Sequence, residues 1–161
     1  PWDQEPTSGW YLGVRGGVSV PMDTKGLGWP VSIESGLEFP SNNPRVSTAL
    51  GLRVTYMYNP PSVFGRETPP WAIGPLIDGR VFIRANRAAE IYPVVAAGFV
   101  FGVDDETQEN IVMPLITTGL GARIKPADSS VYFAPEIGVT NAVVPYMGLA
   151  VGYSQRPKAK K

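Results

Sequence analysis

Apolar residues recur at alternate positions in eight separate segments of this 161-residue chain. The segments span roughly residues 9–20, 27–39, 46–58, 71–84, 89–102, 111–125, 131–140 and 142–153. They are separated by clusters of Pro, Gly, Asn, Asp and Ser, which favour tight turns. A period of two places successive side chains on opposite faces of a strand. The pattern therefore predicts an all-β chain of eight antiparallel strands.

The two faces of these predicted strands differ in chemistry. One face is aliphatic and aromatic along all the segments. The other combines small residues with charged residues, five of each sign: Arg15, Glu34, Glu38, Arg53, Asp78, Arg80, Arg84, Glu90, Arg123 and Glu136. An eight-stranded barrel has an interior that side chains just fill, and arginine–carboxylate contacts can satisfy both partners there. We therefore predict a charge network in the lumen, with Arg53 on the strand next to both Glu34 and Asp78.

The length of the segments and the positions of their aromatic residues indicate a membrane barrel. The segments contain about 10–14 residues, and a tilted strand needs about 9–11 to cross a bilayer. Aromatic residues near the segment ends are predicted to lie at the membrane interfaces: Trp10, Trp29, Tyr56, Tyr58, Trp71 and Tyr153. The expected fold is an up-and-down transmembrane β-barrel with a charged, filled lumen and its apolar face toward lipid.

A soluble, lipocalin-like barrel that binds a ligand is the main structural alternative. It would turn the apolar face inward and leave Gly- and Ala-rich stretches as the solvent surface. Prolines within the predicted strands count against regular central strands of either kind, because each proline lacks a ladder donor. Such prolines stand at positions 75, 93, 114, 135 and 145, among others.

Two short motifs are similar to a known family. GWYLGVRGGVS at residues 9–19 and PYMGLAVGY at residues 145–153 resemble the first and last strands of the OmpA/OmpX-like eight-stranded outer-membrane barrels. The resemblance implies a Gram-negative outer membrane, contact with its lipid, and termini on the periplasmic side. Residues 1–8 would then be an N-terminal periplasmic segment, 9–153 the barrel, and 154–161 a basic tail. Because Pro-Trp-Asp is an improbable translation start, we expect a mature or trimmed product, from which an export signal could have been removed.

Composition argues against several functions. The 14 basic and 14 acidic residues balance, so nucleic acid is not an expected partner. The chain has no Cys and no His, and barrel enzymes of this membrane generally use a His as base. We therefore predict no enzyme activity, no catalytic residue, no cofactor, no bound metal and no small-molecule substrate. The acidic loop around Asp104 and Glu109 could hold a hard cation, although a solvated turn is the favoured interpretation.

Three functions remain for a barrel of this kind. The first, which we favour, is a structural or anchoring subunit, alone or within a larger cell-envelope assembly. The others are a surface-recognition barrel of the adhesin kind and a small pore. The loop NPPSVFGRETPP is the candidate surface for contact with a partner, or else a rigid cap over the barrel mouth. Its candidate contact residues are Pro60, Pro61, Phe64, Arg66, Pro69 and Pro70.

Overall fold

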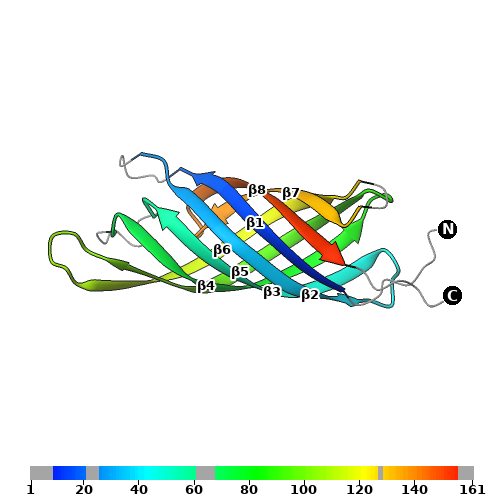
Figure 1. Ribbon diagram of the computed structural model, residues 1–161, viewed down its shortest axis with the longest axis horizontal. Coiled ribbons are helices and arrows are strands. Elements are labelled where there is room, and N and C mark those ends of the chain that lie inside the picture. The colour runs from blue at the N-terminus through cyan, green and yellow to red at the C-terminus, as the bar shows by residue number, and fades with distance from the viewer. Residues whose placement is uncertain (1–8, 21–25, 61–67, 127–128, 156–161) are drawn as a thin grey trace.

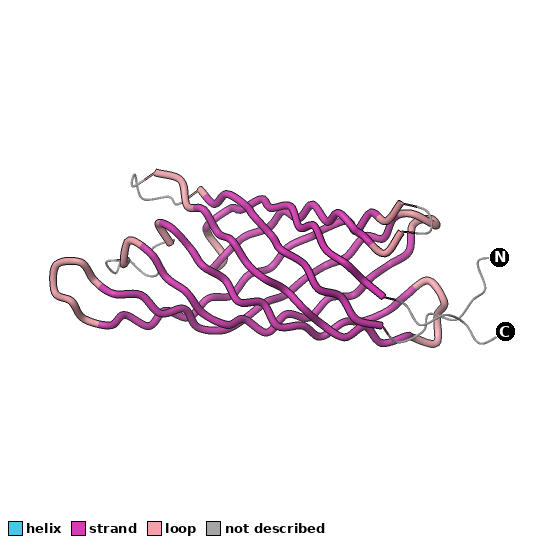
Figure 2. Tube along the Cα trace, in the orientation of Figure 1, coloured by secondary structure: helices cyan, strands magenta, loops and turns pink. Residues whose placement is uncertain are grey.

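Eight strands close into a single barrel in the computed structural model of the chain, which describes residues 9–20, 26–60, 68–126 and 129–155 (Figure 1). The strands are β1 Gly9–Ser19, β2 Trp29–Pro40, β3 Val46–Tyr58, β4 Trp71–Arg84, β5 Ala89–Val103, β6 Asn110–Ile124, β7 Val131–Thr140 and β8 Val144–Gln155. Each strand pairs antiparallel with the next, and β8 pairs with β1. The described residues are strands and connecting loops throughout (Figure 2), and none of their segments is a helix able to cross a membrane.

The sequence prediction of eight strands is confirmed, and the strand boundaries differ by a few residues. β2 begins at Trp29 rather than at residue 27, and β8 spans Val144–Gln155 rather than 142–153. The turn before β8 explains the later start, because Asn141 and Ala142 both have positive φ and therefore lie outside the strand. Two residues of the predicted basic tail belong to β8. Residues 156–161 and the predicted N-terminal segment lie outside the described residues.

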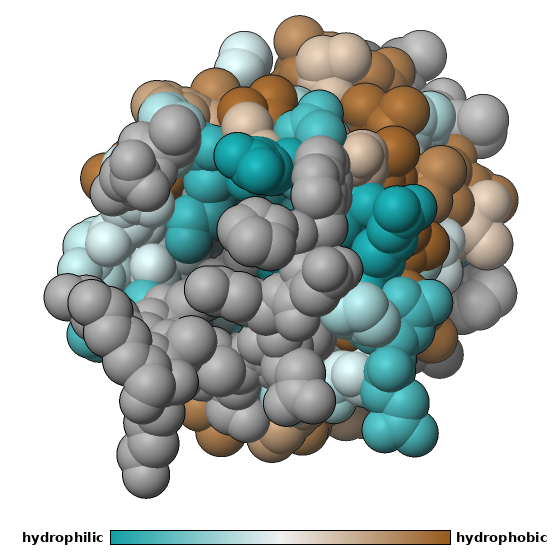
Figure 3. Space-filling model, turned by 90° about the vertical axis from the view of Figure 1, so that its right-hand side faces the viewer, coloured by the Kyte–Doolittle hydropathy of each residue, from teal (hydrophilic) through white to brown (hydrophobic). Residues whose placement is uncertain are grey.

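The apolar face of every strand lies on the outside of the barrel. Ile33, Ile77 and Ile137 expose about 60% of their surface there. Viewed from the end where β1 begins and β8 ends, hydrophobic residues lie along the upper and right-hand rim, and hydrophilic residues lie nearer the middle (Figure 3). An apolar belt of this size would be unfavourable in water and is stable against lipid. This arrangement excludes the lipocalin-like alternative, in which the apolar face would line the interior.

Prolines occur inside these strands because the hydrogen-bond ladders are interrupted beside them. The β4–β5 pairing omits both Pro75 and Pro93, and the β6–β7 pairing omits Pro135. Pro114 lies in the part of β6 that extends beyond its pairing with β7, which starts at Thr117. A missing N–H therefore costs the barrel little at these positions, and proline is compatible with a regular closed sheet.

Buried tyrosine rings occupy the space that inward-facing glycines leave free. Tyr11, Tyr92 and Tyr132 are almost completely buried in the lumen. A side chain added at the glycines around them would meet their rings or hydroxyl groups: Gly36 and Gly51 lie against Tyr11, Gly121 against Tyr92, and Gly13 and Gly152 against Tyr132. The small lumen residues at these positions therefore make room for tyrosine side chains.

We expect Gly51→Ala to destabilise the barrel by about 1–3 kcal/mol, the usual cost of overpacking a filled interior. The new Cβ would meet the Tyr11 hydroxyl and the Asp78 carboxylate, and it would lie 2.9 Å from the Ser35 carbonyl oxygen. Gly79→Ala is the matched control, because Gly79 has open space around the position of a Cβ. Urea unfolding in lipid vesicles measures both variants. Equal stabilities would contradict the proposed packing.

Candidate functional site

Six charged side chains meet in the middle of the lumen and form a neutral set, here called the central cluster: Arg15, Glu34, Arg53, Asp78, Arg80 and Glu136. The shortest contacts come from Arg80, whose Nη2 lies 2.8 Å from Glu34 Oε2 and 2.6 Å from Asp78 Oδ2. The three carboxylates are at most 1% exposed. Three cations and three anions therefore neutralise each other away from solvent.

Strand register brings part of the central cluster together, and long side chains that span the lumen complete it. Arg53 lies directly opposite Glu34 in the β2–β3 ladder. Its Nη2 is 3.8 Å from Glu34 Oε2 and 3.2 Å from Asp78 Oδ2. Glu136 is on β7, far from β3 in strand order, and Arg53 Nη1 still lies 3.5 Å from its Oε1. The cluster thus links opposite walls of the barrel.

Four tyrosine hydroxyls donate hydrogen bonds to the same three carboxylates. The bonds join Tyr11 to Asp78 at 3.2 Å, Tyr132 to Glu34 at 3.3 Å, Tyr92 to Glu136 at 3.1 Å, and Tyr146 to Glu136 at 2.8 Å. A buried carboxylate accepts several hydrogen bonds, and each one made offsets part of its lost hydration. The sequence analysis did not identify these tyrosines. The available signal was that these tyrosines stand at the same alternate, inward-facing positions as the charged residues.

A second neutral set lies nearer the termini and is here called the terminal cluster: Arg84, Arg123, Glu38 and Glu90. Arg123 donates to Glu90 Oε2 at 2.6 Å and to Glu38 Oε2 at 3.0 Å. Ser47 adds a 2.8 Å hydrogen bond to Glu38. The ring of Phe82 lies 3.7 Å from the Arg123 guanidinium carbon, a favourable cation–π distance.

The β3–β6 side of the lumen is apolar toward the loop end, which the sequence analysis did not predict. Buried side chains from β3 to β6 pack together there and form the apolar filler: Met57, Ala72, Leu76, Ala96, Val100, Met113 and Leu115. They share the inward phase with the charged residues. The sequence signal was that charged residues no longer occur at the inward-facing positions toward one end of the segments.

The proline-rich loop is described only at its two ends. Pro60 and Pro69 are buried, and Pro70 is partly buried. The Asn59 N–H donates to the Pro70 carbonyl at 2.9 Å, which closes the base of the loop. Pro61, Phe64 and Arg66 lie outside the described residues. The buried prolines favour the interpretation of a rigid cap at this part of the loop, and the contact role remains a prediction.

All six predicted interfacial aromatics point outward near strand ends. Trp10 and Tyr153 pair at the end with the termini, with ring centroids 5.7 Å apart. Tyr56 and Trp71 stack at the loop end at 6.5 Å, where Trp29 and Tyr58 pair opposite each other in the β2–β3 ladder. These positions suit two interfacial belts, and their role in the membrane stays a prediction.

The acidic loop between β5 and β6 is a hydrogen-bonded turn. The backbone N–H groups of Glu106 and Thr107 both donate to Asp104 Oδ1 at 2.8 Å. These bonds lower the pKa of Asp104, because they stabilise its charged form. Among the residues that the structure describes, no group of acidic side chains could hold a metal ion. Asp104 therefore shapes the turn.

Comparison with known proteins identifies the fold. No family model and no curated protein sequence matches the chain. The crystal structure of Ail, the attachment invasion locus protein of Yersinia pestis, matches with a TM-score of 0.59 and 14% identity, covering 94% of this chain and all of Ail. Ail in complex with the heparin analogue sucrose octasulfate matches with a TM-score of 0.53, with the same identity and coverage. The N-terminal β-barrel domain of Pseudomonas aeruginosa OprF matches with a TM-score of 0.50 and 13% identity, covering 94% of this chain and all of that domain. The chain has the fold of a small transmembrane β-barrel.

We expect Glu34→Gln to destabilise the barrel by about 3–5 kcal/mol, because it leaves buried arginines without their shared anion. Glu34 contacts Arg15 at 3.1 Å and Arg80 at 2.8 Å. The control is Glu106→Gln in the exposed β5–β6 turn, which should change stability little. Unfolding titrations in vesicles give both values. A Glu34 variant as stable as its control would show that the central cluster contributes nothing to folding.

Proposed function

We propose that this chain is a non-enzymatic barrel of the bacterial outer membrane that acts as a structural or anchoring subunit of the cell envelope. Its termini would lie on the periplasmic side. The observation that carries the proposal is the filled lumen. Two neutral charge clusters and the apolar filler occupy its length, and the ten charged residues contact one another through direct ion pairs. A barrel built in this way holds its position in lipid without offering a route through it.

A pore is a poorer explanation of the same lumen. An ion crossing the central cluster would have to separate contacts such as Arg80–Glu34 and Arg53–Asp78. It would then leave buried charges unpaired, which is strongly unfavourable. The apolar filler adds a second obstacle, because it provides little to replace the hydration of an ion.

The unmodified protein, reconstituted into planar bilayers, should show no steady conductance above that of the lipid alone. The physical reason is the cost of breaking the buried ion pairs. Protease protection of the same preparation confirms that the protein has inserted. Large, steady currents from inserted protein would replace the anchoring proposal with a pore.

Surface recognition is the second candidate function, and one feature favours it. The β5–β6 hairpin extends beyond the other strands at the loop end (Figure 1). Both of its strands contain 15 residues, and β6 begins to pair with β7 only at Thr117. Phe101 and Val112 are about half exposed on its outer face. A projecting hairpin of this kind could reach a partner beyond the lipid headgroups.

Photocrosslinking from two exposed turns separates the candidate functions. A photoreactive residue at Gln108 reports on the hairpin tip, and one at Asn86 is the matched position at the end with the termini. The anchoring proposal expects crosslinks to another envelope protein in growing bacteria. Crosslinks from Gln108 alone, to components outside the cell, would support recognition and contradict anchoring. Crosslinks from neither position would contradict both.

A further inference from the structure

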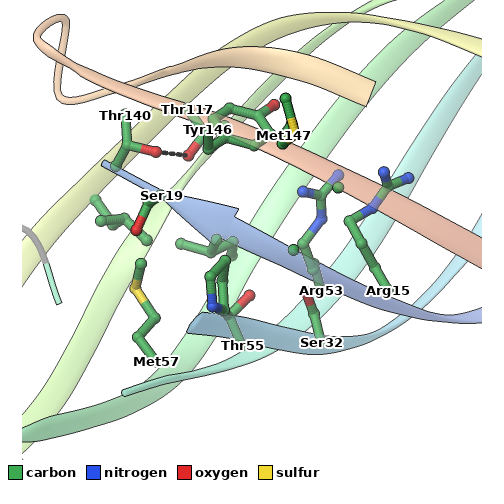
Figure 4. A pocket seen from close by; sticks show the side chains of 15 residues that line it. Arg15, Ser19, Ser32, Arg53, Thr55, Met57, Thr117, Thr140, Tyr146 and Met147 are labelled. Atoms are coloured by element: carbon green, nitrogen blue, oxygen red, sulfur yellow. Dashed lines mark hydrogen bonds between the residues drawn. The ribbon is translucent and has the colours of Figure 1, made fainter. Parts of the chain in front are cut away.

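The chain has no net charge, but its surface charges are divided by sign between the two ends of the barrel. At the loop end, the described residues include no basic side chain, and the β5–β6 turn carries four acidic ones: Asp104, Asp105, Glu106 and Glu109. The adjoining lumen adds no charge beyond the central cluster, because hydroxyl groups such as those of Ser19 and Thr140 line it there (Figure 4). The end with the termini has the opposite sign.

Three basic residues form a surface at that end, here called the basic rim: Arg45, Arg87 and Lys125. The two arginines are exposed, and the lysine is partly buried, with its Nζ donating to Ser154 Oγ at 2.8 Å. The described acids of this end, Glu38 and Glu90, belong to the neutral terminal cluster. The described residues of this end therefore carry a surplus of positive charge. The adjoining segments outside the described residues contain more basic residues than acidic ones: Arg156, Lys158, Lys160 and Lys161 against Asp3, Glu5 and Asp128.

Backbone hydrogen bonds join the connections that carry the basic rim. The Arg84 N–H donates to the Arg45 carbonyl at 2.8 Å, and the Lys125 N–H donates to the Ala88 carbonyl at 2.7 Å. An asparagine side chain accepts two more backbone hydrogen bonds inside the β4–β5 turn, which carries Arg87. The basic rim is therefore a pre-formed surface that follows three successive connections at one end of β3–β6.

The basic rim lies at the edge of the lipid-facing surface. Ile83 and Ile124 are the last outward isoleucines of β4 and β6 toward this end, and each exposes almost half of its surface. Arg45 directly precedes Val46, which pairs with Ile83 in the β3–β4 ladder. Lys125 directly follows Ile124. A strand rises about 3.3 Å per residue, and long basic side chains just beyond an apolar surface extend to the lipid headgroups.

The outward aromatic residues of this end are confined to the other half of the barrel. They lie on β1, β2, β7 and β8: Trp10, Phe39, Phe133 and Tyr153. Among the described residues of β3–β6, no outward-facing aromatic side chain lies at this end. Aromatic rings and cations both hold a membrane protein at the headgroup level. The basic rim thus occupies the part of the circumference that the aromatic residues leave open.

We propose that the basic rim binds the phosphate groups of anionic phospholipids, such as phosphatidylglycerol, in the leaflet at the end with the termini. The proposal rests on the proposed function as a membrane anchor and names the lipid that the anchor prefers. Arg45 and Arg87 make the direct contacts, because a guanidinium donates two parallel hydrogen bonds to phosphate oxygens. Lys125 contributes its charge. The acidic β5–β6 turn repels the same lipids, so the preference is confined to one leaflet.

Lipid-specific quenching of a fluorescent label measures this preference separately at each end. The chain has no cysteine, so Ala88→Cys beside Arg87 and Val143→Cys in the β7–β8 turn each provide a single labelling site. Each labelled protein is placed in phosphatidylcholine nanodiscs with the same small fraction of brominated phosphatidylglycerol or brominated phosphatidylcholine. At position 88 we expect an enrichment of phosphatidylglycerol of about fivefold or more, which weakens at high salt. At position 143 we expect none.

Charge variants test the assignment to the basic rim. Arg45→Gln with Arg87→Gln should abolish the enrichment at position 88, whereas Arg45→Lys with Arg87→Lys should keep most of it, because the charge remains. Asp105→Asn with Glu106→Gln, at the loop end, is the matched control and should leave it unchanged. Equal quenching by the two lipids at position 88, or a preference that survives the glutamine pair, would overturn this proposal and leave the anchoring role intact. Quenching by neither lipid at either position would mean that the barrel does not lie in lipid, which would contradict both.

Discussion

The barrel depends on the mutual neutralisation of the charges that it buries. Each charged side chain in the lumen would be strongly destabilising alone, and Glu34 becomes tolerable only because arginines from three strands contact it. Because each charge depends on several partners, the charged residues of the lumen stabilise the barrel cooperatively. Removing one member leaves several partners unsatisfied, while the lipid-facing wall tolerates any apolar side chain of suitable size. The interior, more than the outer face, therefore requires particular residues at particular places.

Tyrosine and glycine complete this design. Gly36 and Gly51, on neighbouring strands, lie against the Tyr11 ring, whose hydroxyl then reaches Asp78. A phenylalanine there would fill the same space and leave the carboxylate one donor short. A larger residue than glycine would exclude the ring. The fit of the tyrosine ring and the hydrogen bonding of the carboxylate thus depend on the same positions. This explains why so many small residues lie on the charged, inward face of the strands.

The alternation of residues was sufficient to predict the strands, their faces and the charged lumen, because burial in a two-sided sheet has a period of two. It also placed Arg53 on the strand next to both Glu34 and Asp78, and the structure pairs it directly opposite Glu34. It could not predict the contact between Arg53 and Glu136, because that contact crosses the lumen and depends on stagger and side-chain length. Phe82, an inward residue without charge, lies between Arg80 of the central cluster and Arg84 of the terminal cluster along β4, and its ring contacts Arg123. The apolar filler was missed because its residues share the phase of the charges.

The two ends of the lumen differ, and this difference gives the barrel a direction. At the end with the termini, Arg84 is partly exposed and the terminal cluster continues toward solvent. At the loop end, the apolar filler and a group of buried serine and threonine hydroxyls replace the charges. An ion approaching from the terminal side meets fixed ion pairs, whereas one approaching from the loop side meets apolar side chains and hydroxyl groups first. A wall that faces lipid and a closed centre would leave the two ends of the barrel for contact with any partner, and the projecting β5–β6 hairpin lies at the loop end.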